Sequence, residues 1–149
     1  MIHVESTLEP LPVGSEIIEG AASAALVHER AEGDLSIVLT DDKRLQRLNS
    51  DYLGIDAPTD VLAFPASETD PETGAHYLGD VLISIPRAEA QAREARHPLA
   101  SEVQLLVVHG VLHLLGHDHG LAEERARMWV AQGEVLKRIG LAGIVVRES

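Results

Sequence analysis

The chain has 149 residues, and 12 Lys and Arg against 24 Asp and Glu give it a net charge of −12. This length is typical of one domain, so we expect residues 1–149 to fold as a single unit. The negative charge repels polyanions at long range and excludes nucleic-acid binding by bulk charge. No cysteine is present, which excludes disulfides and thiolate metal sites and leaves His and carboxylates as possible ligands.

The chain shows no targeting or membrane signal. No stretch approaches ~20 uninterrupted apolar residues, and residues 1–5 lack a basic region followed by an apolar one. We therefore expect a soluble, cytoplasmic protein. Aromatic residues make up only 3% of the chain, so it has no stacking platform for single strands, and any contact with RNA must be local.

The first half of the chain alternates strands and helices. Residues 2–6 alternate apolar and polar as an edge strand does, and the Ala-rich residues 13–30 follow helical spacing. Residues 35–39 place apolar side chains on one face at period two, which predicts a strand. We expect Thr40 to cap the next helix, which ends at Gly54.

The second half contains two more strands and three more helices. Residues 61–64 predict an edge strand between two prolines, and residues 66–76 an exposed loop. Residues 80–85 predict a strong strand that Pro86 closes. Helices are predicted over 88–95, 98–116 and 121–139, with Pro98 at the first position of its helix. Strands interspersed with amphipathic helices indicate an α/β or α+β fold with a small mixed sheet.

Residues 109–119 contain four of the eight histidines. His109 and His113 are four residues apart, so on a helix both imidazoles reach one metal ion at roughly 2.0–2.1 Å. Gly116 permits a left-handed turn that brings His119 back toward them. We predict that His109, His113 and His119 bind a metal ion. The alternative is that these histidines only occupy a buried helix end.

The spacing of these histidines is that of the metzincin proteases, with one difference. Gly110 replaces the Glu that activates water in those enzymes, so the pattern supports a metal hydrolase but not a protease. Three His ligands leave a fourth position for water, which favours a catalytic site. His117 is predicted to face solvent or to hydrogen-bond a ligand, and Asp118 to orient an imidazole or cap the turn. The spacing assigns no function to His3, His28, His76 and His97.

The segment 109–119 resembles the HGxLHLxGxDH signature of the YbeY family of endoribonucleases at every fixed position. The similarity to that family extends to residues 56–65, to residues 78–84 and to the Leu48-Asn49 pair followed by Tyr52. The resemblance covers roughly residues 34–139. It implies an α+β (mixed α/β) fold with about four strands, five or six helices and a metzincin-like metal-binding helix. It also implies one zinc ion per chain, held by His109, His113 and His119.

The resemblance further implies a metal-dependent, single-strand-specific endoribonuclease that acts in ribosomal RNA 3′-end processing, ribosome maturation and small-subunit quality control. Its expected partners are single-stranded ribosomal RNA and proteins of the small subunit, with no DNA and no membrane. One position departs from the family pattern, because Leu53 stands where the family usually has a substrate-facing Arg. Arg44, Arg47 and Arg87 are candidates to supply this charge from elsewhere, but we expect all three to be solvated helix or loop residues.

Two alternative functions stay open at this stage. The chain is acidic, which suits a ribosome-assembly factor that docks on basic ribosomal proteins, with a structural zinc site and weak or no nuclease activity. The site also suits metal-dependent hydrolysis of a small molecule or peptide, although Gly110 argues against the peptide. Asp60 and Asp80 either position a water molecule or hold loop amides, and we expect the structural role. No residue is an evident general acid or base.

Overall fold

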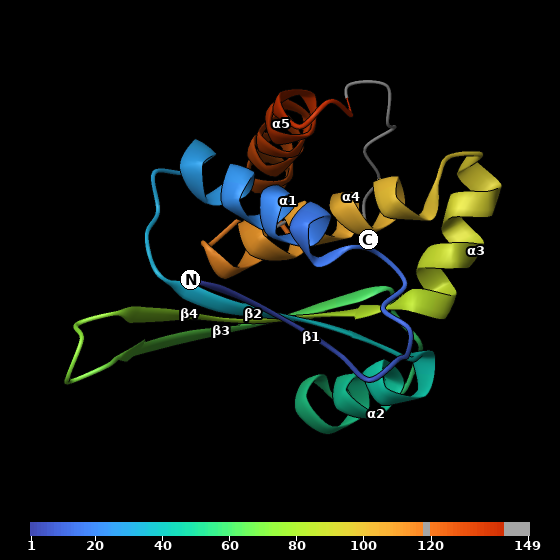
Figure 1. Ribbon diagram of the computed structural model, residues 1–149, viewed down its shortest axis with the longest axis horizontal. Coiled ribbons are helices and arrows are strands. Elements are labelled where there is room, and N and C mark those ends of the chain that lie inside the picture. Colours follow the sequence, from blue (N-terminus) through green and yellow to red (C-terminus); the bar gives the residue numbers. More distant parts are fainter. Residues whose placement is uncertain (118–119, 142–149) are drawn as a thin grey trace.

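The computed structural model describes residues 1–117 and 120–141. Within them, a sheet of four strands packs with five helices, which confirms the predicted α+β class (Figure 1). The elements in chain order are β1 (Ile2–Ser6), α1 (Ser15–His28), β2 (Asp34–Thr40), α2 (Asp42–Leu53), β3 (Val61–Thr69), β4 (His76–Ser84), α3 (Ile85–Ala95), α4 (Leu99–Leu114) and α5 (Ala122–Arg138). No helix in this part of the chain is long and apolar enough to cross a membrane.

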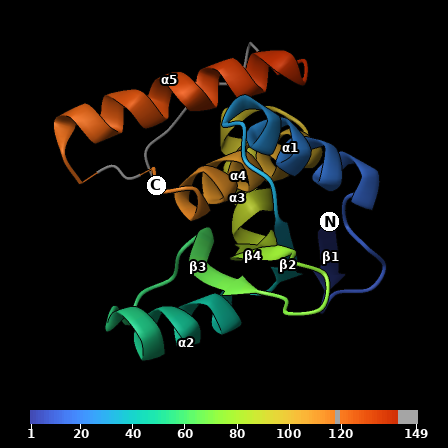
Figure 2. The same ribbon diagram turned by 90° about the vertical axis from the view of Figure 1, so that its left-hand side faces the viewer.

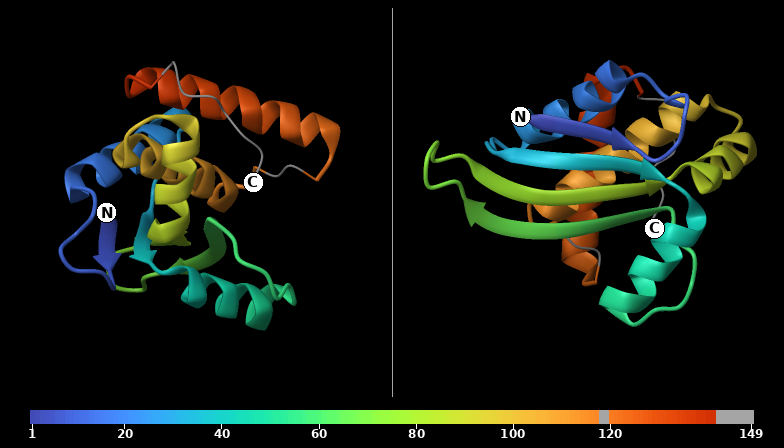
Figure 3. Two further views of the ribbon diagram at one scale, coloured as in Figure 1. Left: turned by 90° about the vertical axis from the view of Figure 1, so that its right-hand side faces the viewer. Right: turned by 60° about the horizontal axis from the view of Figure 1, so that its bottom comes forward.

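The sheet has the strand order β1-β2-β4-β3. Strands β1, β2 and β4 are parallel, and β3 runs antiparallel to β4. The alternation predicted for β2 is confirmed, since Leu35, Ile37 and Leu39 are fully buried. Figure 3 shows β3 at one margin of the sheet and β1 at the other. Both are therefore edge strands.

The helices cover the two faces of the sheet unequally. Helices α1, α4 and α5 lie over one face and α2 lies under the other (Figures 1 and 2). The main core fills the space between the sheet and the first group. A second, small core of Leu45, Leu62 and Leu82 lies between α2 and the sheet. Side chains of β3 therefore alternate between two separate hydrophobic clusters.

The predicted loop over 66–76 is wrong at both ends, because β3 continues to Thr69 and β4 begins at His76, so only residues 70–75 lie between the strands. Pro65 does not end β3. A proline is tolerated in an edge strand where its nitrogen points away from the neighbouring strand, and Pro65 lies opposite Gly79 within the β3–β4 ladder. The result is a long hairpin.

Three predicted helix boundaries also differ from the structure. Thr40 does not cap α2, because it is the last residue of β2, and the Asp41 carboxylate instead accepts a hydrogen bond from the Arg44 N–H at 2.8 Å. Pro98 precedes α4 instead of occupying its first position. Helix α3 begins at Ile85, three residues before the predicted start. At each boundary, the local sequence allows neighbouring starts and the tertiary structure selects one.

Candidate metal centre

Helix α4 is the central helix of the fold and carries the candidate ligands His109 and His113. Eleven of its 16 residues are buried, because it packs against the sheet on one side and against α1, α3 and α5 elsewhere. The helix ends as predicted, since Gly116 has φ +99°. The N–H of His117 donates to the Leu112 carbonyl at 3.0 Å and closes this turn.

The two histidines point their Nε2 atoms at one another. These atoms are 3.1 Å apart, and the ring centroids are separated by 4.7 Å in an edge-to-face arrangement. Two imidazoles bound to one tetrahedral zinc ion at about 2.0–2.1 Å place their nitrogens roughly 3.3 Å apart. The pair therefore fits a shared metal ion without a change of helix geometry.

The orientation of His109 is fixed from the opposite side of its ring. Its Nδ1 lies 2.6 Å from the Oε1 atom of Gln132, which is buried on α5. An amide oxygen accepts a hydrogen bond, so Nδ1 carries the proton and Nε2 presents its lone pair to the cleft. His109 itself is only 4% exposed. This is the arrangement that metal-bound histidines require.

The third predicted ligand, His119, and Asp118 lie outside the described residues. No group of three or more His, Asp or Glu side chains in residues 1–117 and 120–141 is placed to hold a metal ion. The structure thus brings together two of the three predicted ligands.

Gly110 lies where α4 packs tightly against β3 and β4. A Cβ atom at this position would be 2.5 Å from Cγ1 of Val81 and 3.4 Å from Cγ2 of Val61. Val81 is fully buried and cannot move aside cheaply. The position that holds the general base in metzincin proteases therefore has no room for any side chain in this fold.

The histidine pair forms part of a cleft of about 230 Å³. Its other lining residues come from the end of α2, the loop before β3, β3 and α4, namely Leu53, Thr59, Val61, Leu62, Ala63, Pro65 and Gly110. Leu53 is 56% exposed, so the cleft wall is apolar at this position. None of these lining residues carries a permanent positive charge.

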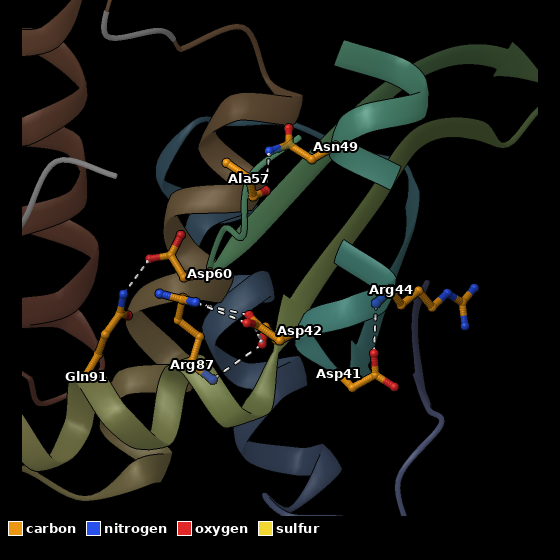
Figure 4. Close-up of polar contacts among 9 residues, drawn as sticks. Asp41, Asp42, Arg44, Asn49, Ala57, Asp60, Arg87 and Gln91 are labelled. Atoms are coloured by element: carbon orange, nitrogen blue, oxygen red, sulfur yellow. Dashed lines mark hydrogen bonds and ion pairs between the residues drawn. The ribbon is translucent and has the colours of Figure 1, made fainter. Parts of the chain in front are cut away.

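The arginines considered as substitutes for that charge lie elsewhere. Arg87 pairs with Asp42, with Nη2 at 3.0 Å from Oδ2 and Nε at 3.2 Å from Oδ1. These hydrogen bonds lower the pKa of Asp42 and raise that of Arg87. Figure 4 shows the Arg44 side chain extending away from this pair. Arg44, Arg47 and Arg87 are all absent from the cleft lining.

Asp60 and Asp80 have hydrogen-bond partners within the fold. The Asp60 carboxylate accepts from Nε2 of Gln91 on α3 at 3.2 Å (Figure 4). Asp80 accepts from the Tyr77 hydroxyl, and burial together with this bond raises the pKa of Tyr77. Neither aspartate lines the cleft, which supports the structural role expected for both.

His117 points away from the His109–His113 pair. Its Nε2 hydrogen-bonds the carboxylate of Glu29 at the end of α1, not a ligand histidine. His28 contacts Glu29 at 2.7 Å and Glu134 at 2.6 Å, and the bond to Glu134 is the main cause of its raised pKa. Burial alone raises the pKa of Glu29, but bonds from both histidines outweigh it and lower the pKa.

Sequence reasoning missed two parts of this site. Gln132 lies 23 positions after His109, and nothing in its local sequence distinguishes it from a surface glutamine. For the wall formed by β3, the sequence predicts only a short edge strand, although the prolines around it indicate an unpaired margin. Both features depend on how α5 and the sheet pack around α4.

Comparison with known proteins confirms the resemblance seen in the sequence. A family model described as Endoribonuclease YbeY matches residues 12–140. The chain is 42% identical over 142 residues to the Endoribonuclease YbeY of Moorella thermoacetica, covering 87% of this chain and 91% of that protein. It is 44% identical over 138 residues to that of a Roseiflexus species, covering 87% and 86%.

The fold is also similar to that of a solved protein. The solution structure of TM1509 from Thermotoga maritima matches with a TM-score of 0.58 and 24% identity, over 100% of this chain and 99% of that one. This likeness concerns the fold alone, whereas the sequence matches extend over most of both chains. The chain therefore belongs to the Endoribonuclease YbeY family.

Proposed function

We propose that this protein is a zinc-dependent endoribonuclease that cuts single-stranded RNA by hydrolysis. The observation that carries the proposal is the pair of Nε2 atoms, 3.1 Å apart in an open cleft. The family name supports RNA as the substrate. We infer that His109, His113 and His119 hold one zinc ion per chain, with His119 assigned from its spacing in the sequence.

A bound zinc ion supplies a Lewis acid for the phosphoryl oxygen and a water molecule with a pKa lowered toward neutrality. The protein's own residues determine orientation. Gln132 holds the His109 ring so that Nε2 faces the cleft, and α4 fixes the spacing to His113. Gly110 lets α4 pack directly against Val81 and Val61, which holds the histidine pair close to β3.

The proposed biological substrate is single-stranded ribosomal RNA, cut during 3′-end processing, maturation and quality control of the small ribosomal subunit in the cytoplasm. The support is the family membership together with the charge of the chain. A net charge of −12 disfavours nonspecific binding to RNA. It suits docking on basic proteins of the small subunit, which then deliver the RNA strand to the cleft.

Metal removal is the direct test of this proposal. We expect wild-type protein to cut a labelled single-stranded ribosomal RNA fragment at discrete positions, to lose this activity in chelator and to regain it with zinc. The products are separated on a denaturing gel, and the zinc content is measured in parallel. Cleavage that persists in metal-free protein contradicts the proposal.

The contact from Gln132 leads to a second prediction. The substitution Gln132→Leu removes the acceptor for the Nδ1–H of His109 and is expected to weaken zinc binding by about 10–100-fold. The measurement is a zinc titration against a competing chelator. Gln91→Leu is the matched control, since it removes a glutamine bonded to Asp60 and should leave zinc affinity unchanged. Equal affinity in both variants contradicts the assigned role.

A second candidate function is favoured by one observation. None of the described residues that line the cleft is Lys or Arg, and Leu53 occupies the position of the family's usual arginine. In this candidate function, the protein is a ribosome-assembly factor that docks on ribosomal proteins and retains zinc for structure. Metal-containing protein that binds small-subunit proteins but leaves RNA intact supports this function over the first.

A further inference from the structure

Strand β3 has one edge that pairs with β4 and one that does not. The N–H of Ser84 donates to the carbonyl of Asp60 at 2.9 Å, and Val61 lies opposite Ile83. Residues along an antiparallel ladder alternate between facing the partner strand and facing away from it. Val61 and Ala63 therefore direct their N–H and C=O groups toward the free edge.

Pro65 supports this assignment of directions independently. It is the next outward-facing position after Ala63 in the register. A proline has no N–H, so it fits a ladder only where no donor is needed. Its presence within β3 is consistent with a backbone that turns every second residue away from β4.

The free edge of β3 is also a wall of the cleft. Val61, Ala63 and Pro65 line it together with His109 and His113. None of the residues described, 1–117 and 120–141, accepts a hydrogen bond from the N–H of Val61 or Ala63. The Val61 carbonyl already accepts from the Thr59 hydroxyl at 3.3 Å. The edge thus offers the cleft two N–H donors and the carbonyls of Ala63 and Pro65.

A phosphodiester in this cleft requires hydrogen-bond donors. The lining residues that the structure describes include no Lys or Arg, so side-chain cations do not meet this need. Backbone N–H groups are common donors to phosphate oxygens. Two such groups at alternate positions of a strand lie roughly 6.8 Å apart, which is comparable with the separation of consecutive phosphates in an extended single strand.

We propose that the free edge of β3 binds the backbone of the RNA strand in the cleft. The N–H groups of Val61 and Ala63 donate to non-bridging oxygens of consecutive phosphates beside the histidine pair. The Ala63 carbonyl accepts from a ribose 2′-hydroxyl, a group that DNA lacks. This inference rests on the proposed function, since it assigns the RNA a path through the same cleft.

The substitution Ala63→Pro tests the edge because it removes one outward N–H and keeps the carbonyl. An edge strand tolerates a proline there, as Pro65 shows, and the preceding residue is already extended. Thermal unfolding and zinc content establish that each variant is folded and loaded.

Val4→Pro on β1 is the matched control because it places a proline in the opposite edge strand. The N–H of Thr7 donates to the Leu39 carbonyl, and the Met1 carbonyl accepts from the Leu35 N–H. Odd-numbered residues of β1 therefore face β2, and Val4 directs its N–H outward. This variant reports the cost of a proline in an edge strand away from the cleft.

The readouts are the KM and kcat for a labelled single-stranded RNA and the Kd for the same RNA with chelated, metal-free protein. A hydrogen bond to a charged acceptor contributes enough that Ala63→Pro should raise KM and Kd about tenfold. We expect kcat of Ala63→Pro to stay within about twofold, and Val4→Pro to match wild type. Wild-type values for a folded Ala63→Pro protein overturn the proposal.

The cleavage kinetics and the Kd for RNA distinguish a failure of this inference from a failure of the proposed function. If wild-type protein binds RNA without cutting it, the nuclease function fails, and the Kd of Ala63→Pro still decides whether the β3 edge holds the strand. If wild-type protein does not bind the RNA at all, the edge assignment fails too. If Ala63→Pro binds RNA as tightly as wild type but loses affinity for an extended alanine-rich peptide, the RNA proposal is overturned. The free edge of β3 then binds a peptide strand instead.

Discussion

Replacement of His113 by alanine is expected to lower the rate of RNA cleavage by about 1,000-fold or more, because the metal site loses a ligand and with it the activated water. The Nε2 atom of His113 is one of the two that converge at 3.1 Å. Its side chain is only partly buried, and alanine favours the helix, so the fold should persist. The measurement is single-turnover cleavage of a labelled RNA together with zinc content.

His76→Ala is the matched control for this variant. It also removes one histidine, but from the exposed start of β4 in the hairpin, outside the cleft. We expect wild-type cleavage and zinc content from this control. A His113→Ala protein that cuts RNA at a tenth of the wild-type rate or faster contradicts the assigned role.

The substitution Gly79→Ala is expected to cost about 4 kcal/mol of unfolding free energy, because it adds a steric clash to an unfavourable backbone conformation. A Cβ atom at Gly79 would lie 2.2 Å from the carbonyl oxygen of Phe64 and 2.9 Å from Leu114 of α4. Gly79 also has φ +137°. The hairpin ladder fixes the neighbouring strand, so the carbonyl cannot move without loss of register.

Gly74→Ala separates these two causes. Gly74 also has a positive φ, +73°, but open space surrounds its Cβ position. It should cost only about 1 kcal/mol for the backbone conformation. Urea unfolding of both variants gives the comparison. Equal loss of stability in the two proteins contradicts the steric explanation.

The sequence predicts best those structural features that depend on a single helix or turn. The helix that carries His109 and His113 followed from an apolar run, and their shared face followed from a spacing of four residues. Both properties are local to α4, so no knowledge of the remaining fold was needed. The left-handed turn at Gly116 followed in the same way.

Features that depend on contacts between elements could not be predicted. Gln132 reaches His109 only because α5 packs over α4, and His117 pairs with Glu29, which lies 88 positions earlier in the chain. From the sequence, the absence of a side chain at Gly110 indicates only the loss of a catalytic base. The structure gives a different physical reason, since the adjacent Val81 side chain leaves no space.

Because α4 is buried, some residues of the candidate centre tolerate substitution much less than others. His109 and Gly110 are buried on α4, where substitutions that alter shape disrupt packing. Leu53 is exposed at the opposite margin, where replacement costs the fold little. Substitutions at the exposed rim of the cleft can therefore alter which RNA strands fit there at little cost in stability, whereas the buried floor that carries His109 is constrained by the requirement to fold.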